Sequence, residues 1–439
     1  MPAPRSCRRR AAIAILCAAL LGSACTGLAG LTHDESERLD TFDAYWQPLA
    51  DDYPMFGRQV DWDELRQRYR GAVPFARAPD EFYHLLTGML SELADPHVSF
   101  TVPAERFAAD GTAPTSLLDE PAFRVLPIEG RLHVVQWPAG AAPTPPEGVP
   151  DEAIYPELWR VEGFPVVLSL VGNLLLGPPD APVELQLRWR NGVVTRHVMR
   201  RPPAGTKRRT SPLGHLDAQG LLWEARTYAP FPWLAIHTLD DELDMAQIDE
   251  RIDAASNGDA LVLDLRSNLG GRWLRAQQLV ERFLPEPIDL VLVPAHPTST
   301  WFGLFDVEMF VRSEWHPRPP RFTRPLVVLT SALTGSAAEH AARVLQRHAG
   351  ALVVGERTAG AEAAIQEVHG PDGGVLRFGS MRIVDRTGVG LQSGGVVPDV
   401  SVRLSLDDLE RLGPEGSVAD WERRLRAAAA SAIRTAPRP

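Results

Sequence analysis

The chain has 439 residues, enough for two or three domains that each bury a core. Its hydrophobic fraction of 44% and charged fraction of 23% are ordinary for a folded globular protein. The formal charge of -11 argues against nucleic-acid binding, which normally requires a basic face.

Residues 1–25 have the features of an export signal. A basic segment, 5–10, precedes an apolar stretch, 11–21, that is too short to span a bilayer comfortably. Small residues then lead to Cys25, which leaves two outcomes open: a lipidated Cys25 that anchors the chain to a membrane, or plain cleavage after Ala24. All 3 cysteines lie in this segment, so the rest of the chain has neither a disulfide nor a cysteine nucleophile. We expect an exported protein of the cell envelope, either periplasmic or membrane-anchored.

Residues 33–110 are predicted to be mainly helical. The clearest helix begins at Asp80 and repeats apolar residues at i, i+3, i+4 and i+7 as far as Leu93. The Asp95-Pro96 step ends it, because proline disfavours the helical conformation in the preceding residue.

Residues 115–205 alternate in hydrophobicity as strands do, and Asn191-Gly192 is typical of a hairpin turn. The segment LWRVEGFPV, 158–166, resembles a stretch of PDZ domains, which bind peptide ends by strand addition. A glycine-rich carboxylate-binding loop of the PDZ type is not evident in the sequence. Two interpretations therefore stay open: a degenerate PDZ-like domain, or a small β-rich spacer.

Between residues 225 and 405 the chain alternates predicted strands and helices, the pattern of a layered α/β core. The predicted strands cover 233–236, 261–265, 290–293, 326–330 and 352–354. The predicted helices cover 241–255, 273–283 and 336–348. Residues 406–439 are predicted to be a helical tail, with 417–434 as its clearest helix. Catalytic groups are expected at strand ends and in loops.

Two predicted strands in this core end in segments that could form a catalytic site: one leads to a serine and the other to a glycine-rich loop. The strand LVVLT, 326–330, runs through a turn of small residues into a helix that begins at Ser336. A hydroxyl there faces helix amides and the positive end of the helix dipole, which stabilise an oxyanion, although most serines at helix starts are only N-caps. The second strand, LVLDLR at 261–266, runs directly into SNLGG at 267–271.

These two segments are followed by GERTAG at 355–360 and GGVVPDV at 394–400. In kind and order, the four segments resemble the motifs of C-terminal-processing and tricorn-type serine peptidases, over about residues 228–402. The resemblance implies a multidomain α/β (α+β) fold. Its layered peptidase core would be of the ClpP/crotonase-like type, after an N-terminal helical region and the PDZ-like β-rich domain. It also implies acyl-enzyme chemistry with Ser336 as the nucleophile.

A serine hydroxyl needs a base to remove its proton. The C-terminal-processing branch of the family uses a lysine, and the matching position here is Ala361. The only lysine after the leader, Lys207, lies outside the motifs, and arginine does not deprotonate in proteins. The tricorn-like branch takes a histidine from an LxDxH segment, which is residues 93–97 here, so the resemblance makes His97 the base. An imidazole accepts a proton near neutrality.

The chain departs from the family pattern at two positions. Pro96 stands where the tricorn archetype has a serine, and Gln392 stands where the resemblance places the glutamate that orients the histidine. A glutamine can orient an imidazole through a hydrogen bond, but it does not stabilise an imidazolium by charge. Asp95, Glu362 and Glu339 remain as candidate carboxylates, and Glu339 is expected on the helix surface or behind the site.

Main-chain N–H groups would form the oxyanion hole. Ala337, just after the nucleophile, is one expected donor, and Gly270 or Gly271 is the other, because glycine lets the main chain approach a substrate closely. Asp264 and Arg266 are expected to form a structural pair. The sequence contains no cofactor or metal motif, and residues 370–374 are expected to be a hairpin turn.

Three functions fit these patterns. The first is an exported serine peptidase that acts on peptides or proteins through Ser336 and His97. The second is a weakened or inactive relative that binds peptides or a cell-envelope partner, an alternative favoured by Pro96 and Gln392. The third is a hydrolase of esters or other small acyl substrates. The sequence does not determine the oligomeric state.

Overall fold

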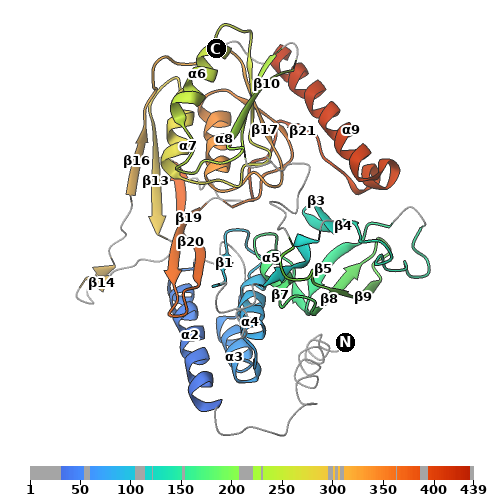
Figure 1. Cartoon of the computed structure of the whole chain (residues 1–439). Helices are drawn as coiled ribbons and strands as arrows, with labels where there is room; N and C mark the ends of the chain where they lie inside the picture. The colour runs from blue at the N-terminus through green and yellow to red at the C-terminus, as the bar shows by residue number, and fades with distance from the viewer. Residues whose placement is uncertain are drawn as a thin grey trace, which may run out of the picture.

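The structure, a computed structural model, describes residues 31–435 except for the following segments: 54–59, 104–113, 121, 151–153, 207–220, 229–230, 295–299, 302–304, 307–310, 362 and 386–393. The predicted export signal, Lys207, Glu362 and Gln392 lie outside the described residues. Figure 1 shows the core sheet and its helices in the upper half, the N-terminal helices below, and a separate small sheet beside them.

The core is a six-stranded sheet. Its strands, in spatial order, are β10 (Trp223–Tyr228), β11 (Phe231–Ile236), β12 (Leu261–Asp264), β17 (Leu326–Thr330), β18 (Leu352–Gly355) and β21 (Val400–Ser401). Only β10 runs antiparallel to its neighbour. Parallel strands are buried on both faces, which explains why β12 and β17 are continuous apolar runs.

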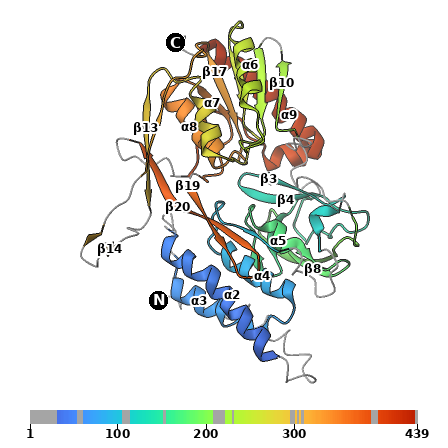
Figure 2. The ribbon, with the colours of Figure 1, turned by 60° about the vertical axis from the view of Figure 1, so that its left-hand side comes forward.

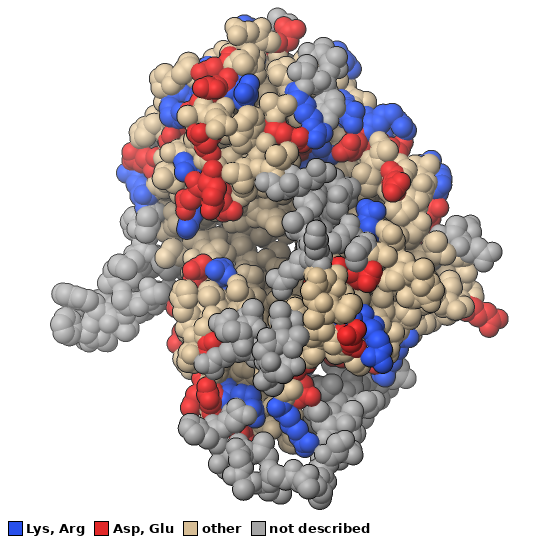
Figure 3. Space-filling model, in the orientation of Figure 1, with Lys and Arg blue, Asp and Glu red and all other residues tan. Residues whose placement is uncertain are grey.

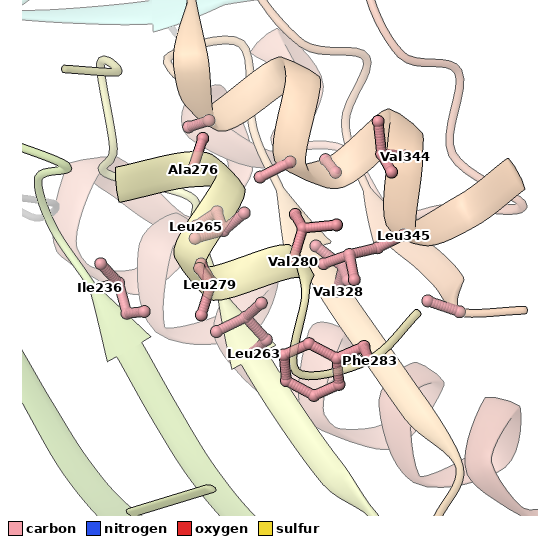
Figure 4. Packing of buried hydrophobic residues seen from close by; sticks show 14 of the residues in the cluster. Ile236, Leu263, Leu265, Ala276, Leu279, Val280, Phe283, Val328, Val344 and Leu345 are labelled. Atoms are coloured by element: carbon pink, nitrogen blue, oxygen red, sulfur yellow. The ribbon is translucent and has the colours of Figure 1, made fainter. Parts of the chain in front are cut away.

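Helices cover both faces of this sheet. Leu261 and Leu263 face a cluster with α6 (Met245–Ala255), α7 (Trp273–Val280) and α8 (Ala337–His348). In Figure 4, α7 and α8 lie side by side on the strands, with Leu279 and Val280 directed toward the strands and α8. The alternate side chain, Val262, packs on the opposite face with α9 (Leu406–Thr435), a helix interrupted at Gly413.

A second, antiparallel sheet connects the core to the N-terminal helices. Its strands are β1 (Ser99–Thr101), β20 (Val375–Asp385), β13 (Ile288–Pro294), β16 (Val311–Trp315) and β19 (Ala363–His369), which pairs with β20 alone. The β19–β20 hairpin runs from beside the core down to the helical region (Figure 2). Two short strands, β14 (Thr300–Trp301) and β15 (Phe305–Asp306), form a separate pair.

The N-terminal helices have their own core. They are α2 (Leu31–Asp52), α3 (Trp62–Arg70), η3 (Val73–Phe75) and α4 (Pro79–Ser91). An aromatic-rich cluster joins them to Phe100 of β1 and to Leu376 and Phe378 of β20. Within the described ranges, no helix is long and apolar enough to cross a bilayer.

The third sheet contains β3 (Arg124–Ile128), β4 (Arg131–Gln136), β5 (Glu157–Val161), β8 (Pro182–Arg188) and β9 (Val194–Arg200), with β6 (Phe164–Pro165) at its side. Nearby are β2 (Thr115–Ser116), η5 (Leu117–Asp119), α5 (Val171–Leu175) and β7 (Leu176–Gly177). Leu126 and Ile128 of β3 are buried against the core sheet and α9. The PDZ-like assignment of this region stays a prediction.

The multidomain α/β fold expected from the sequence is confirmed, and several boundaries need correction. The helix predicted from 241 begins at Met245, because Asp244 is its N-cap and accepts the N–H of Ala246. The helix predicted to end at 283 ends at Val280. The strand predicted at 290–293 covers 288–294 and belongs to the second sheet, not to the core sheet.

Candidate active site

Ser336 occupies the sharp turn between β17 and α8. Its φ of 49° and ψ of -124° are strained values for a residue other than glycine. Two hydrogen bonds to the segment after β12 hold this turn. Thr334 Oγ1 donates to the carbonyl of Leu265 at 2.9 Å, and the N–H of Gly335 donates to the carbonyl of Asn268 at 3.0 Å. The surrounding structure therefore holds a partly exposed hydroxyl at the start of a helix.

The glycine loop after β12 packs directly against this turn. A Cβ on Gly270 would lie 2.7 Å from the Cβ of Ser336, so only glycine allows this approach. The N–H of Gly270 donates to Asn268 Oδ1 at 2.8 Å. By contrast, the N–H groups of Gly271 and Ala337 have no acceptor in the described part of the chain. These two donors remain open to an oxyanion.

Glu339 lies in the first turn of α8 and is fully buried, so of its two expected positions it takes the one behind the site and not the one on the helix surface. Its carboxylate accepts the N–H of Ser336 at 3.2 Å, of Gly360 at 2.8 Å and of Ala361 at 2.6 Å, together with the hydroxyl of Thr358. Burial raises the pKa of Glu339, although these four hydrogen bonds oppose that shift. The residue joins the serine turn to the loop before β19.

His97 lies in the turn between α4 and β1 and contacts Ala363, the first residue of β19. Its Nε2 accepts the N–H of Ala363 at 2.9 Å, and its Nδ1 lies 3.7 Å from Asp95 Oδ1. Asp95 also accepts the N–H of His97 at 2.9 Å and the hydroxyl of Tyr53 at 2.6 Å. Hydrogen bonds therefore connect Ser336 and the loop residues Gly360 and Ala361 to Glu339, and Ala363, two positions further on, to His97.

A second buried histidine, His340, lies one helical turn after Ser336. Its ring packs against Trp273 of α7 with centroids 5.1 Å apart, and neither ring nitrogen has a partner within the described part of the chain. Burial lowers the pKa of His340 to about 3, and the charge of His97 contributes to this shift. His97 is therefore close enough to α8 to influence a residue next to the serine turn.

The remaining sequence expectations have separate outcomes. Asp264 and Arg266 form the expected ion pair, with Oδ2 and Nη2 2.6 Å apart. Residues 370–374 form the expected hairpin turn, closed by a hydrogen bond between Gly370 N–H and the Gly374 carbonyl. Within the described ranges, no group of three His, Cys, Asp or Glu side chains is arranged to hold a metal ion.

Two residues at the site carried no sequence signal. Tyr53 is distant in sequence from every motif, and Ala363 is the first residue of a strand that the sequence did not predict. Their contacts arise only when β19 and the end of α2 come to the segment around His97.

The chain shares its multidomain α/β fold with solved structures of low sequence identity. Mature CPAF, at 15% sequence identity, superposes with a TM-score of 0.61 over 92% of this chain and 98% of its own. Mature CPAF complexed with lactacystin gives a TM-score of 0.60, also at 15% identity, over 92% of this chain and 100% of that one.

The sequence comparisons find two family matches within the chain. Residues 233–402 match the model of peptidase family S41, and residues 34–91 match the tricorn protease C1 domain. These two segments are therefore similar to parts of C-terminal-processing and tricorn-type peptidases. The chloroplastic carboxyl-terminal-processing peptidase 1 of Arabidopsis thaliana is 31% identical over 154 residues, which cover 34% of this chain and 29% of that relative.

Proposed function

We propose that the protein is a serine peptidase that hydrolyses peptide bonds. The observation that carries this proposal is the strained Ser336 turn packed against Gly270, with the N–H groups of Ala337 and of the next loop residue, Gly271, lacking an acceptor among the described residues. Donors fixed in advance around a developing oxyanion are commonly the largest single contribution to acyl transfer. The match of residues 233–402 to peptidase family S41 supports the same reaction class.

In the proposed reaction, Ser336 Oγ attacks the peptide carbonyl carbon and its proton passes to His97 Nε2. The imidazolium then protonates the leaving amine as the C–N bond breaks. Water hydrolyses the acyl-enzyme with the same base. Before the first step, His97 Nε2 must exchange the N–H of Ala363 for the serine hydroxyl, and we propose that substrate binding drives this exchange.

An extended peptide suits the surroundings of the site. Among the described strands β19 pairs only with β20. The N–H of Ala363 points away from that partner toward His97, so the outer edge of β19 faces the site. Strand addition at such an edge is a common mode of peptide binding. Leu269, 67% exposed, and Ile365, 42% exposed, offer apolar contacts beside the glycine loop and along β19. In Figure 3 the surface is hollowed between the upper and lower parts of the molecule, and uncharged residues line the visible wall.

A fluorophosphonate probe tests the proposal, because it modifies only activated serines. We expect labelling at Ser336 in the wild type, none in Ser336→Ala, and a rate lowered about a hundredfold or more in His97→Ala. Mass spectrometry of the labelled peptide identifies the modified residue. Unfolded protein fragments and a nitrophenyl ester, offered side by side, separate peptide hydrolysis from simple ester hydrolysis.

The chain provides a matched control in Ser267, whose Oγ lies 2.5 Å from His237 Nδ1. Ser267→Ala should label as the wild type does. Labelling at Ser267, or no labelling of folded wild-type protein at any pH near neutrality, would contradict the proposal. The second result would favour the alternative function, a relative that binds peptides without cleaving them.

A further inference from the structure

The proposed reaction creates a positive charge on His97, and the residue at position 392 does not balance it. Gln392 is neutral at every pH at which proteins stay folded. In serine triads, replacing the orienting carboxylate by its amide lowers the rate by several orders of magnitude. The site therefore needs a carboxylate from another part of the chain.

Asp95 is a carboxylate held against the ring of His97. Its Oδ1 lies 3.7 Å from Nδ1 and also accepts the main-chain N–H of His97 at 2.9 Å. Its Oδ2 accepts the hydroxyl of Tyr53 at 2.6 Å, and the side chain is almost completely buried. Because both oxygens accept hydrogen bonds from buried groups, the carboxylate has little freedom to rotate away from His97.

The contact with Ala363 determines which ring nitrogen carries the proton. A main-chain N–H only donates, so His97 Nε2 must accept and is unprotonated. The proton of the neutral ring is therefore on Nδ1, the nitrogen that faces Asp95. This tautomer leaves Nε2 as the base, as the proposed reaction requires.

Among the residues that the structure describes, the other ionisable groups near His97 are poor candidates for this role. Glu339 already accepts four hydrogen bonds from Ser336, Thr358 and residues 360–361. His340 remains neutral above about pH 3. Tyr53 donates a hydrogen bond from its neutral hydroxyl to Asp95 and supplies no negative charge of its own.

We propose that Asp95, held by Tyr53, is the positioning carboxylate of His97, in place of the residue at 392. This inference rests on the proposed function. It assigns to Asp95 two effects: it fixes the Nδ1–H tautomer, and its charge stabilises the imidazolium that forms during acylation.

Asp95→Asn provides the test, because asparagine keeps an oxygen for the N–H of His97 and removes the negative charge, while its NH2 group meets the Tyr53 hydroxyl as a donor. At neutral pH we expect fluorophosphonate labelling of Ser336 to slow between about tenfold and a thousandfold. The acid limb of its pH profile should also move to lower pH, since an imidazolium without a negative neighbour loses its proton more easily. Merely weakened packing would slow labelling without moving this limb.

One competing variant and one control accompany it. Gln392→Ala changes the residue at the position that the family resemblance assigns to this role, and it should slow labelling of Ser336 less than Asp95→Asn does. Asp119→Asn removes another buried carboxylate that accepts a main-chain N–H, from Ser116 at 2.8 Å, and should leave both rate and profile unchanged. An Asp95→Asn protein with a wild-type rate and an unmoved acid limb overturns the inference, as does a Gln392→Ala protein that loses as much activity.

An NMR titration of the His97 ring tests the inference separately from the proposed function. In Asp95→Asn the ring should protonate at lower pH than in the wild type, whether or not Ser336 reacts with the probe. If wild-type protein fails to label but this shift is present, the proposed function fails and the inference about Asp95 holds. An identical titration in both proteins overturns the inference.

Discussion

At the scale of single residues, the site combines strained and buried groups that would be unfavourable alone. Ser336 has a positive φ, Gly270 allows a close approach that any side chain would block, and Glu339 is buried without a cation. Each is tolerated because hydrogen bonds from two neighbouring loops hold it in place. These groups sit together at the end of the parallel strands β12 and β17, where functional groups of α/β sheets commonly lie.

His340 should make the stability of the protein sensitive to acid. Its pKa is lowered to about 3 in the folded protein, from an ordinary value near ~6.5 when unfolded. The folded state gains stability from its neutral ring above pH ~6.5 and loses it as pH falls toward 3. His340→Leu should therefore show a weaker fall in unfolding free energy between pH 6.5 and 4, by up to about 1.4 kcal/mol per pH unit.

Urea unfolding at several pH values measures this difference. His369→Leu, which changes an exposed histidine of β19, is the matched control and should retain the wild-type pH dependence. If the unfolding free energies of wild type and His340→Leu fall equally with pH, the buried ring does not resist protonation.

At the scale of elements, the β19–β20 hairpin joins the site to the N-terminal helices. One end of β19 places Ala363 against His97, and the turn at the other end is buried among α2 and α4. There Asp372 accepts the hydroxyls of Tyr45 and Tyr83, the latter at 2.9 Å. Burial and the neighbouring carboxylate raise the pKa of Tyr45, so its hydroxyl stays a donor.

Asp372→Asn should weaken this anchor and affect the distant site. A hydrogen bond to a buried charged group contributes about 1.5–3 kcal/mol, so we expect a loss of stability of that order. We also expect slower labelling of Ser336, because the hairpin sets the position of Ala363 beside His97. Urea unfolding and the labelling rate are the two measurements.

Glu367→Gln in the same hairpin is the control. Its carboxylate pairs with Arg377 at 2.6 Å on the surface, where such pairs contribute little. It should change neither stability nor labelling by a measurable amount. An Asp372→Asn protein that is destabilised but labels at the wild-type rate would show that the hairpin tip does not position the base.

At the scale of the whole molecule, one apolar cluster connects three parts of the chain. Trp421 of α9 is almost completely buried, donates its indole N–H to the carbonyl of Val402 at 3.0 Å, and packs near the guanidinium of Arg266. The same cluster contains Leu126 and Ile128 of the third sheet. The third sheet, α9 and the core sheet therefore share one buried surface.

Trp421→Ala should destabilise the protein by about 3–5 kcal/mol, the usual cost of removing a large aromatic side chain from a core. Near-UV circular dichroism during urea unfolding measures it. Leu412→Ala, an exposed change in the same helix, should cost less than about 0.5 kcal/mol. A cost below about 1 kcal/mol for Trp421→Ala would mean that α9 is dispensable for holding the three parts together.

The sequence by itself determined the local elements and the order of the motifs. The strand at 326–330 was predicted with its observed bounds, and the helix after Ser336 with a one-residue difference, because apolar period and small-residue turns act over a few neighbouring positions. The glycine loop at 270–271 was likewise evident from composition alone. The family resemblance was visible for the same reason.

Only the tertiary structure decided which groups meet at His97. The Ala363 contact joins residues 266 positions apart, and β19, with its alternation of half-buried and exposed side chains, was not predicted at all. Asp95 is adjacent in sequence, yet its orientation depends on Tyr53, which the sequence did not single out. Long-range pairing is specified by the fit of whole surfaces, and no local pattern encodes it.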